Sequence, residues 1–323
     1  MILHEDKNIF HSAIQMTAAA LNIKPHFVEK DYWICRSLQQ MVRADSSHHA
    51  IFKGGTSLTK AYNIGARFSE DIDVAIADAH LMSGNQLKTT IRRTAHSMTE
   101  GLIEVVKPNF TSKGSHYHKA YYAYPTISEV PTTSAVRSGE LLLEINSFAN
   151  PYPWEIRTIR CFITEYLLSS GNAALVEQFD MADIEVPVLD RRRTLTEKLV
   201  SLMRCSLADD YLPQITAKIR HFYDLHHLLH DDACQSYIHS NDFLADFQSL
   251  LEHDRQSFAK PDGWQTRTLN QSPLIVNLHS TWQKLQPTYL SELPDLAYRD
   301  IPAVDAVEES ITTLLSLVVT NYE

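Results

Sequence analysis

The spacing of apolar residues divides this 323-residue chain into three parts. In the first part, apolar residues recur at helical intervals over 8–21, from 27 to about 42 and over 85–106. A short apolar run at 50–53 and an alternating run at 71–77 predict two strands between these helices. The first part therefore predicts helices that pack on strands.

The middle and last parts differ in the period of their apolar residues. Aromatic and branched side chains between turn signals predict strands over 117–124, 140–147, 156–163 and 184–189. After Asp190 the period is helical, over 194–207, 214–230, 242–253, 274–285 and 304–319. This order predicts an α+β domain over 1–185, followed by an α-helical domain over 186–323.

The composition is that of an ordinary globular protein, with 44% hydrophobic and 21% charged residues. There is no apolar run of about 18 residues and no basic start of a secretion signal, so we expect no membrane span and a cytosolic location. The net charge of −10 disfavours broad nucleic-acid binding, which needs a dense basic face. It leaves room for a local basic groove. One candidate consists of Arg191, Arg192, Arg193, Lys198 and Arg204, and another consists of Lys88, Arg92 and Arg93.

A glycine turn follows the first expected strand. Gly54 and Gly55 end that strand, and Thr56 or Ser57 can begin a helix that continues through Tyr62. Backbone N–H groups at such a turn and helix start favour an anion, and the two hydroxyls add donors. The turn is not a Walker loop, because the spacing and the lysine of that motif are absent. Taken alone, it predicts either phosphate binding or a plain structural turn.

An aspartate pair follows on the second expected strand. Alternate residues of a strand point to the same face, so Asp71 and Asp73 lie side by side while Ile72 points away. Two carboxylates this close repel unless a cation lies between them, and Mg²⁺ prefers such oxygens. We expect a third carboxylate from a neighbouring strand, and Glu144 is the acid inside the apolar run 141–146. The alternative is that Glu144 faces solvent from an edge strand.

The combination of the glycine turn with the aspartate pair, which Arg67 and Ser69 precede, is more specific than either feature alone. Here the chain resembles the nucleotidyltransferase superfamily, and more closely its AbiEii/AbiGii-type toxin branch with the MenT-like toxins. His221 departs from the family pattern, which often has an aspartate there, so that only Asp224 carries over. Four blocks carry the resemblance: 29–33, 53–73, 193–198 and 218–225.

The resemblance implies a nucleotidyltransferase fold, in which a mixed sheet flanked by helices precedes a helical bundle that closes the active-site cleft. It implies transfer of a nucleoside monophosphate from a nucleoside triphosphate (NTP) to a hydroxyl, which is the tRNA 3′ end in characterised branches. The chain would be the toxin of a toxin–antitoxin or phage-defence pair, with a cognate antitoxin protein as partner. The implied residues are Gly54, Gly55, Thr56 and Ser57 with Arg67 and Ser69 for the nucleotide, Asp71 and Asp73 for Mg²⁺, Lys198 for the triphosphate, and Asp224 to complete the site.

Alternatives remain open for the helical residues and for the function. Lys198 could be a solvated flank of its helix, and Asp224 could simply pair with Arg220, which lies one helical turn earlier. A transferase of the same fold could act on a small molecule or a protein, and the acidic net charge keeps this alternative open. A non-catalytic fold that only binds a partner is the other alternative.

Overall fold

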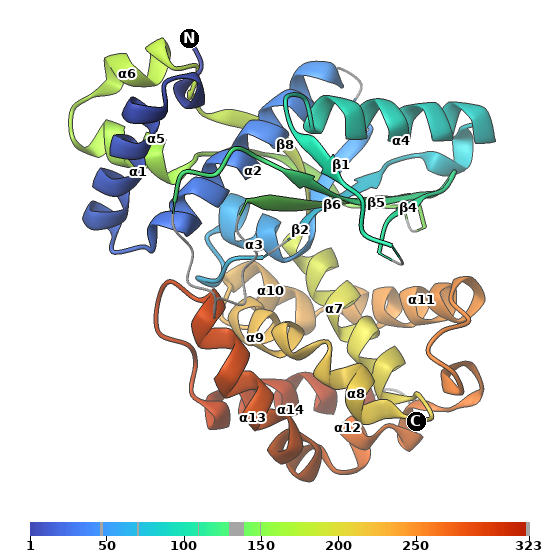
Figure 1. Cartoon of the computed structure of the whole chain (residues 1–323). Helices are drawn as coiled ribbons and strands as arrows, with labels where there is room; N and C mark the ends of the chain where they lie inside the picture. The colour runs from blue at the N-terminus through green and yellow to red at the C-terminus, as the bar shows by residue number, and fades with distance from the viewer. Residues whose placement is uncertain (46–47, 70, 109, 129–138, 149, 321–323) are drawn as a thin grey trace. The chain divides into compact units, whose positions relative to one another are not determined.

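The computed structural model describes all residues except 46–47, 70, 109, 129–138, 149 and 321–323. The chain forms two compact units (Figure 1). The first comprises residues 1–62 and 68–189, and the second comprises residues 63–67 and 190–323. The short segment 63–67 therefore belongs to the second unit, although it lies in the first third of the sequence.

The first unit is built on a mixed sheet. Its strand order is β3-β5-β6-β2-β1-β8-β7, and β4 pairs with β5. The pairs β2–β6 and β1–β8 are parallel and the remaining neighbours are antiparallel, which confirms the expected mixed sheet. The strands are β1 Ala50–Lys53, β2 Asp71–Ile76, β3 Ile103–Val105, β4 Ser112–Lys113, β5 Tyr117–Ala123, β6 Glu140–Asn146, β7 Trp154–Ile159 and β8 Ile184–Leu189.

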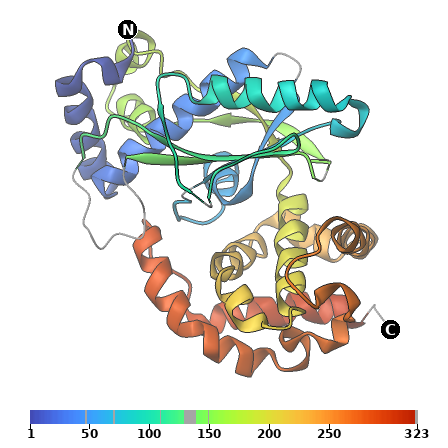
Figure 2. The ribbon, with the colours of Figure 1, turned by 45° about the vertical axis from the view of Figure 1, so that its right-hand side comes forward.

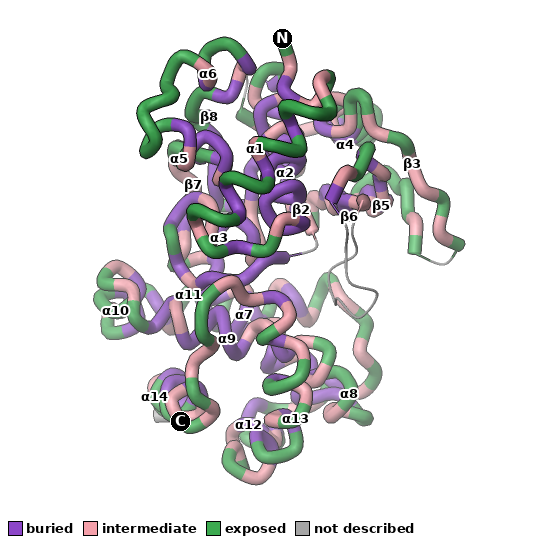
Figure 3. The backbone as a smooth tube through the Cα atoms, turned by 60° about the vertical axis from the view of Figure 1, so that its left-hand side comes forward, coloured by how far each residue is buried: buried purple, intermediate pink, exposed green. Residues whose placement is uncertain are grey.

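Helices cover both faces of this sheet. The helices α2 and α4 lie on one face and α3 lies on the other (Figure 2). Because α2 is packed between the sheet and the helices α1, α4 and α5, it is buried over most of its length (Figure 3). The helices are α1 Lys7–Leu21, α2 Pro25–Ala44, α3 Gly54–Tyr62, α4 Gly84–Met98, α5 Phe162–Ser169 and α6 Ala173–Gln178.

Along β2, apolar side chains of the core alternate with the two candidate site residues. Ile72 and Val74 are buried at 1% and 0% exposure on the face that α2 and α4 cover. Asp71 and Asp73 are half-buried and point to the opposite face, where α3 lies. The apolar side of the strand therefore fixes the direction of both carboxylates.

The second unit is helical. The helix α7 runs through it and contacts α8, α9, α10, α11 and α12, while α9 also packs against α13 and α14. Large aromatic side chains fill its core, among them Trp264, Trp282 and Tyr289. The helices are α7 Arg191–Ser206, α8 Tyr211–Thr216, α9 Ile219–Leu228, α10 Asp232–Ile238, α11 Asn241–Ser257, α12 Pro273–Val276, α13 Leu278–Leu296 and α14 Val304–Thr320. In neither unit is a helix of the described residues long and apolar enough to cross a membrane.

Four expected elements differ in the structure, one of them the helix expected over 274–285, which is divided at Asn277 into α12 and α13. The helix expected over 85–106 ends at Met98, because Gly101 turns the backbone at φ +79° into β3. The strand expected over 156–163 ends at Ile159, and α5 begins three residues later. The helix expected over 214–230 is two helices, α8 and α9. An apolar period alone does not distinguish one helix from two short ones in succession.

Candidate active site

The glycine turn and the aspartate pair lie in direct contact. Gly54 begins α3 at φ +80°, in the left-handed region that favours glycine. A Cβ atom on Gly54 would lie 2.1 Å from Oδ2 of Asp73. Glycine is therefore required at this position for two reasons. It allows the left-handed backbone conformation, and it leaves the space that the Asp73 carboxylate occupies.

The two hydroxyls after the turn hold it in place. Thr56 Oγ1 donates a hydrogen bond to the backbone carbonyl of Asp71 over 2.7 Å, and Ser57 Oγ donates to the carbonyl of Gly54 over 2.9 Å. Both side chains are buried. The structure thus gives each hydroxyl an acceptor in the protein, and their predicted role in phosphate binding stays a prediction. Gly55 is half-buried in the first turn of α3. Its backbone N–H is one of those that have no acceptor within the helix, because they lie at the helix start.

A row of charged residues crosses four strands at the level of Asp73. In the strand register, Lys53 of β1 lies opposite Asp73, Asp73 lies opposite Glu144 of β6, and Glu144 lies opposite Lys119 of β5. Two acids at the centre of the row are therefore flanked by two lysines. Glu144 has the strand position that a third carboxylate next to Asp73 requires.

The Glu144 carboxylate is engaged by residues of β5. One oxygen lies 2.5 Å from Lys119 Nζ, and the other accepts a hydrogen bond from the Tyr117 hydroxyl over 2.8 Å. Burial, together with the nearby charge of Glu144, raises the pKa of Tyr117, so that the phenol remains a donor. Burial opposes the charged form of Lys119, but the hydrogen bond and charge of Glu144 outweigh it and raise the pKa of this ammonium.

Two adjacent carboxylates on one face of β2 have the chemistry that a divalent cation requires. In the described part of the chain, however, no three acidic, histidine or cysteine side chains converge as a metal site would need. Glu144 faces Lys119 and Tyr117 instead. The assignment of Glu144 as a metal ligand therefore stays a prediction.

The predicted residues of the helical unit form one buried cluster. Arg67 donates from Nε to Oδ1 of Asp224 over 2.8 Å and from Nη2 to Oδ2 over 2.6 Å. Lys198 Nζ lies 2.7 Å from the same Oδ2, and the three side chains are 4%, 8% and 5% exposed in the order Arg67, Lys198, Asp224. Lys198 is therefore not a solvated flank, and Asp224 pairs with two cations other than Arg220. Ser69, two residues after Arg67, is also buried but belongs to the first unit.

The charges of this cluster are tightly coupled. Burial on its own raises the pKa of Asp224, but Arg67 and Lys198 outweigh burial and hold that pKa well below its usual range. Burial and the charges of Lys198 and Lys218 hold the pKa of His221 well below its usual value, so this side chain is neutral at pH 7. His221 therefore adds no positive charge to the cluster.

The candidate basic groove over 191–204 is largely neutralised in the structure. Arg191 pairs with Asp231, Arg192 with Asp190, and Arg193 with Glu197. Arg204 pairs with Asp254 over 2.7 Å. The local excess of positive charge that the sequence suggests here is therefore largely balanced by acids.

Two charged residues of α2, Glu29 and Asp31, have structural roles that the sequence did not reveal. The Glu29 carboxylate, at 0% exposure, accepts hydrogen bonds from the backbone N–H groups of Ile127 and Ser128. Asp31 Oδ1 lies 2.6 Å from Lys60 Nζ, and Oδ2 accepts from the N–H at the start of α5. The available signal was the run of charges inside an otherwise apolar helix, which requires buried partners.

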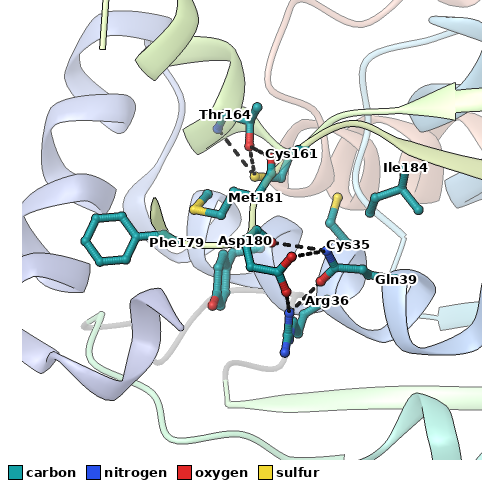
Figure 4. A pocket seen from close by; sticks show the side chains of 11 residues that line it. Cys35, Arg36, Gln39, Cys161, Thr164, Phe179, Asp180, Met181 and Ile184 are labelled. Carbon is teal, nitrogen blue, oxygen red and sulfur yellow. Dashed lines mark hydrogen bonds and ion pairs between the residues drawn. The ribbon is translucent and has the colours of Figure 1, made fainter. Parts of the chain in front are cut away.

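Two cavities of the first unit contain none of the predicted site residues. One, of about 20 Å³, is lined by Cys35, Cys161 and Asp180 and is large enough for a single water (Figure 4). Another, of about 260 Å³, lies beside Trp33 and Met98. All four cysteines of the chain are buried free thiols.

Comparisons with known proteins support the assignment to the nucleotidyltransferase toxins. The family model described as the nucleotidyl transferase AbiEii toxin of a type IV toxin–antitoxin system matches residues 36–310. Among solved structures, the chain is similar to MenT4, a nucleotidyltransferase toxin from Mycobacterium tuberculosis H37Rv, with 16% identity, a TM-score of 0.54, and coverage of 95% of this chain and 85% of that chain. A putative nucleotidyltransferase from H. pylori also matches, with 14% identity, a TM-score of 0.41, and coverage of 92% and 98%. No curated protein sequence matches. At 16% identity the likeness to MenT4 supports the fold alone.

Proposed function

We propose a reaction for this chain, which belongs to the AbiEii family of nucleotidyltransferase toxins of type IV toxin–antitoxin systems. It transfers a nucleoside monophosphate from an NTP to the 3′ end of tRNA. The enzyme class, nucleotidyltransferase, follows from the family. The observation that carries the proposal is the contact of the Asp73 carboxylate with Gly54, which joins an acid pair to a helix start. That contact combines the two groups that a metal-bound triphosphate needs.

Asp71 and Asp73 are the residues that would hold Mg²⁺, with Glu144 as the third candidate. Bound there, the ion would neutralise phosphate charge, which is the main requirement of this class of transfer. Gly54, Gly55 and their neighbours would direct backbone N–H groups of the first turn of α3 at the phosphates.

Lys198 would neutralise charge on the triphosphate. Its ammonium is buried and held by Asp224, so its position is fixed before a nucleotide arrives. Preorganised charge contributes more to catalysis than charge that must reorganise during the reaction.

The acceptor and the setting rest on the family resemblance. The 3′ end of tRNA is the proposed acceptor, the cytoplasm is the proposed location, and defence against phage is the proposed setting. A cognate antitoxin is the partner that a type IV system implies. The paired arginines 191–193 and the net charge of −10 favour a second candidate, a protein or small-molecule acceptor.

The test is incubation of the protein with Mg²⁺ and each NTP in turn, labelled on the α-phosphate, together with separate pools of tRNA, other RNA and protein. We expect label at the 3′ end of tRNA, and no label with the Asp73→Asn variant. Label in the protein pool alone would replace tRNA by the second candidate. If no pool takes up label from any NTP, the proposed transfer is wrong.

A further inference from the structure

The Asp224 carboxylate is almost fully used within the protein. Its Oδ1 accepts from Arg67 Nε, and its Oδ2 receives both Arg67 Nη2 and Lys198 Nζ. A carboxylate offers about four lone-pair sites, and three are occupied here. This leaves little capacity for a metal ion. Asp224 therefore differs from Asp71 and Asp73, although the family resemblance places all three in the active site.

Arg67 is fixed by the backbone as well as by its side chain. The N–H of the preceding Ala66 donates to the Tyr223 hydroxyl over 2.8 Å, and the Ala66 carbonyl accepts from the N–H of Tyr298 over 2.9 Å. Gly65, at φ +74°, packs so closely that a Cβ would lie 3.1 Å from the Tyr223 ring. The guanidinium therefore reaches Asp224 from a held segment, and its two-point contact fixes the plane of the carboxylate.

Arg67 and Lys198 both contact the one carboxylate of Asp224, and His221 beside it is neutral. Of the two cations, Lys198 makes the single-point contact and has further N–H donors for a phosphate oxygen.

We propose that Asp224 and Arg67 are positioning residues that act through Lys198. Arg67 orients the Asp224 carboxylate, Asp224 holds the Lys198 ammonium, and Lys198 alone of the three contacts the triphosphate. This inference rests on the proposed function. It changes one role that the sequence suggests, since Arg67 is then not a nucleotide ligand, and it specifies how Asp224 completes the site.

The first test compares Asp224→Asn, Lys198→Met and the double variant. Asparagine keeps the shape of the side chain but releases the ammonium, so we expect the KM for NTP to rise about tenfold, as the loss of a charge-assisted hydrogen bond would give. The double variant should be no worse than Lys198→Met alone, because Asp224 acts through Lys198. The Mg²⁺ concentration for half-maximal rate should stay within twofold of the wild-type value.

Two outcomes would overturn the proposal for Asp224. A clear rise in the Mg²⁺ requirement of Asp224→Asn would make this residue a metal ligand. If the increases in KM caused by the two substitutions multiply in the double variant, Asp224 does not act through Lys198. Asp254→Asn is the matched control, because it also breaks an Arg–Asp pair of the second unit, one that is partly buried, and it should leave the KM unchanged.

The second test concerns Arg67. Arg67→Lys keeps the charge but loses the two-point contact, so we expect a smaller rise in KM than for Arg67→Met. In the Asp224→Asn background, Arg67→Met should add little. An equal effect of Arg67→Met in both backgrounds would place Arg67 on the nucleotide and refute its positioning role.

Calorimetric binding of inorganic tripolyphosphate separates this inference from the proposed function. Tripolyphosphate should bind the wild type, and Asp224→Asn should weaken binding about as much as Lys198→Met. If these results hold while no NTP supports transfer, the proposed reaction fails and the cluster stands as an anion site. If tripolyphosphate binds all three proteins equally, the positioning role of Asp224 is wrong.

Discussion

Gly54 is the residue at which backbone conformation and site chemistry meet. Replacing it with alanine forces a side chain into the left-handed region, at a cost of about 1–2 kcal/mol, and places a methyl group on the Asp73 carboxylate. We expect Gly54→Ala to abolish NMP transfer and to lower the free energy of unfolding, measured in urea. Gly101→Ala is the matched control, because Gly101 has φ +79° and nothing within 4 Å of the added methyl. If Gly54→Ala keeps full transfer, the contact with Asp73 is not part of the site.

Asp224 also gives a prediction for the dependence of stability on pH. Its pKa is held below the value of an unfolded aspartate, so its contribution to stability is fully present above about pH 5 and is lost as the pH falls through and below about 4. We therefore expect the stability difference between the wild type and Asp224→Asn to shrink as the pH is lowered. Urea unfolding of both proteins at about pH 7, 5 and 3.5 measures this stability difference. A difference that is constant over this range would mean that the two cations do not stabilise the ionised carboxylate.

At the scale of elements, α3 is held at both ends. Its start contacts Asp73, and in its last turn the Lys60 ammonium lies 2.6 Å from Asp31 of α2 and donates to the carbonyl of Arg160. Asp31 in turn accepts from the N–H of Phe162, at the start of α5. The buried pair therefore connects three helices around the element that begins with the glycine turn.

Removing one partner of this pair leaves the other charge buried. Lys60→Met should lower the free energy of unfolding by about 3–5 kcal/mol, the usual cost of breaking a buried ion pair. The double variant Lys60→Met with Asp31→Asn should be more stable than Lys60→Met alone, because the unpaired carboxylate is then absent. Lys260→Met, which breaks a pair exposed at 78% and 72%, should cost little. Equal stability of Lys60→Met and the wild type would contradict this account.

The sequence predicted local geometry well and distant pairing poorly. The alternation of β2 correctly placed Asp71 and Asp73 on one face, and a run of apolar residues around one acid indicated that Glu144 would lie on the neighbouring strand. The partner of Asp224 was not predictable, because helical spacing suggested Arg220 whereas Arg67 lies 157 residues away in sequence. The start of α5 was missed because branched and aromatic residues continue from the end of the strand into the first turn of the helix.

At the scale of the whole molecule, the family assigns this chain to the toxins, and toxicity should depend on transfer. We expect that induced expression of the wild-type chain slows bacterial growth and that Asp73→Asn at the same protein level does not. Asp254→Asn should remain toxic, because it changes a buried acid of the helical unit that has no proposed role in the reaction. Growth curves with protein levels measured on blots give the comparison. If Asp73→Asn remains as toxic as the wild type, growth inhibition arises from binding a partner rather than from transfer. The non-catalytic alternative would then replace the enzymatic one as the explanation of toxicity.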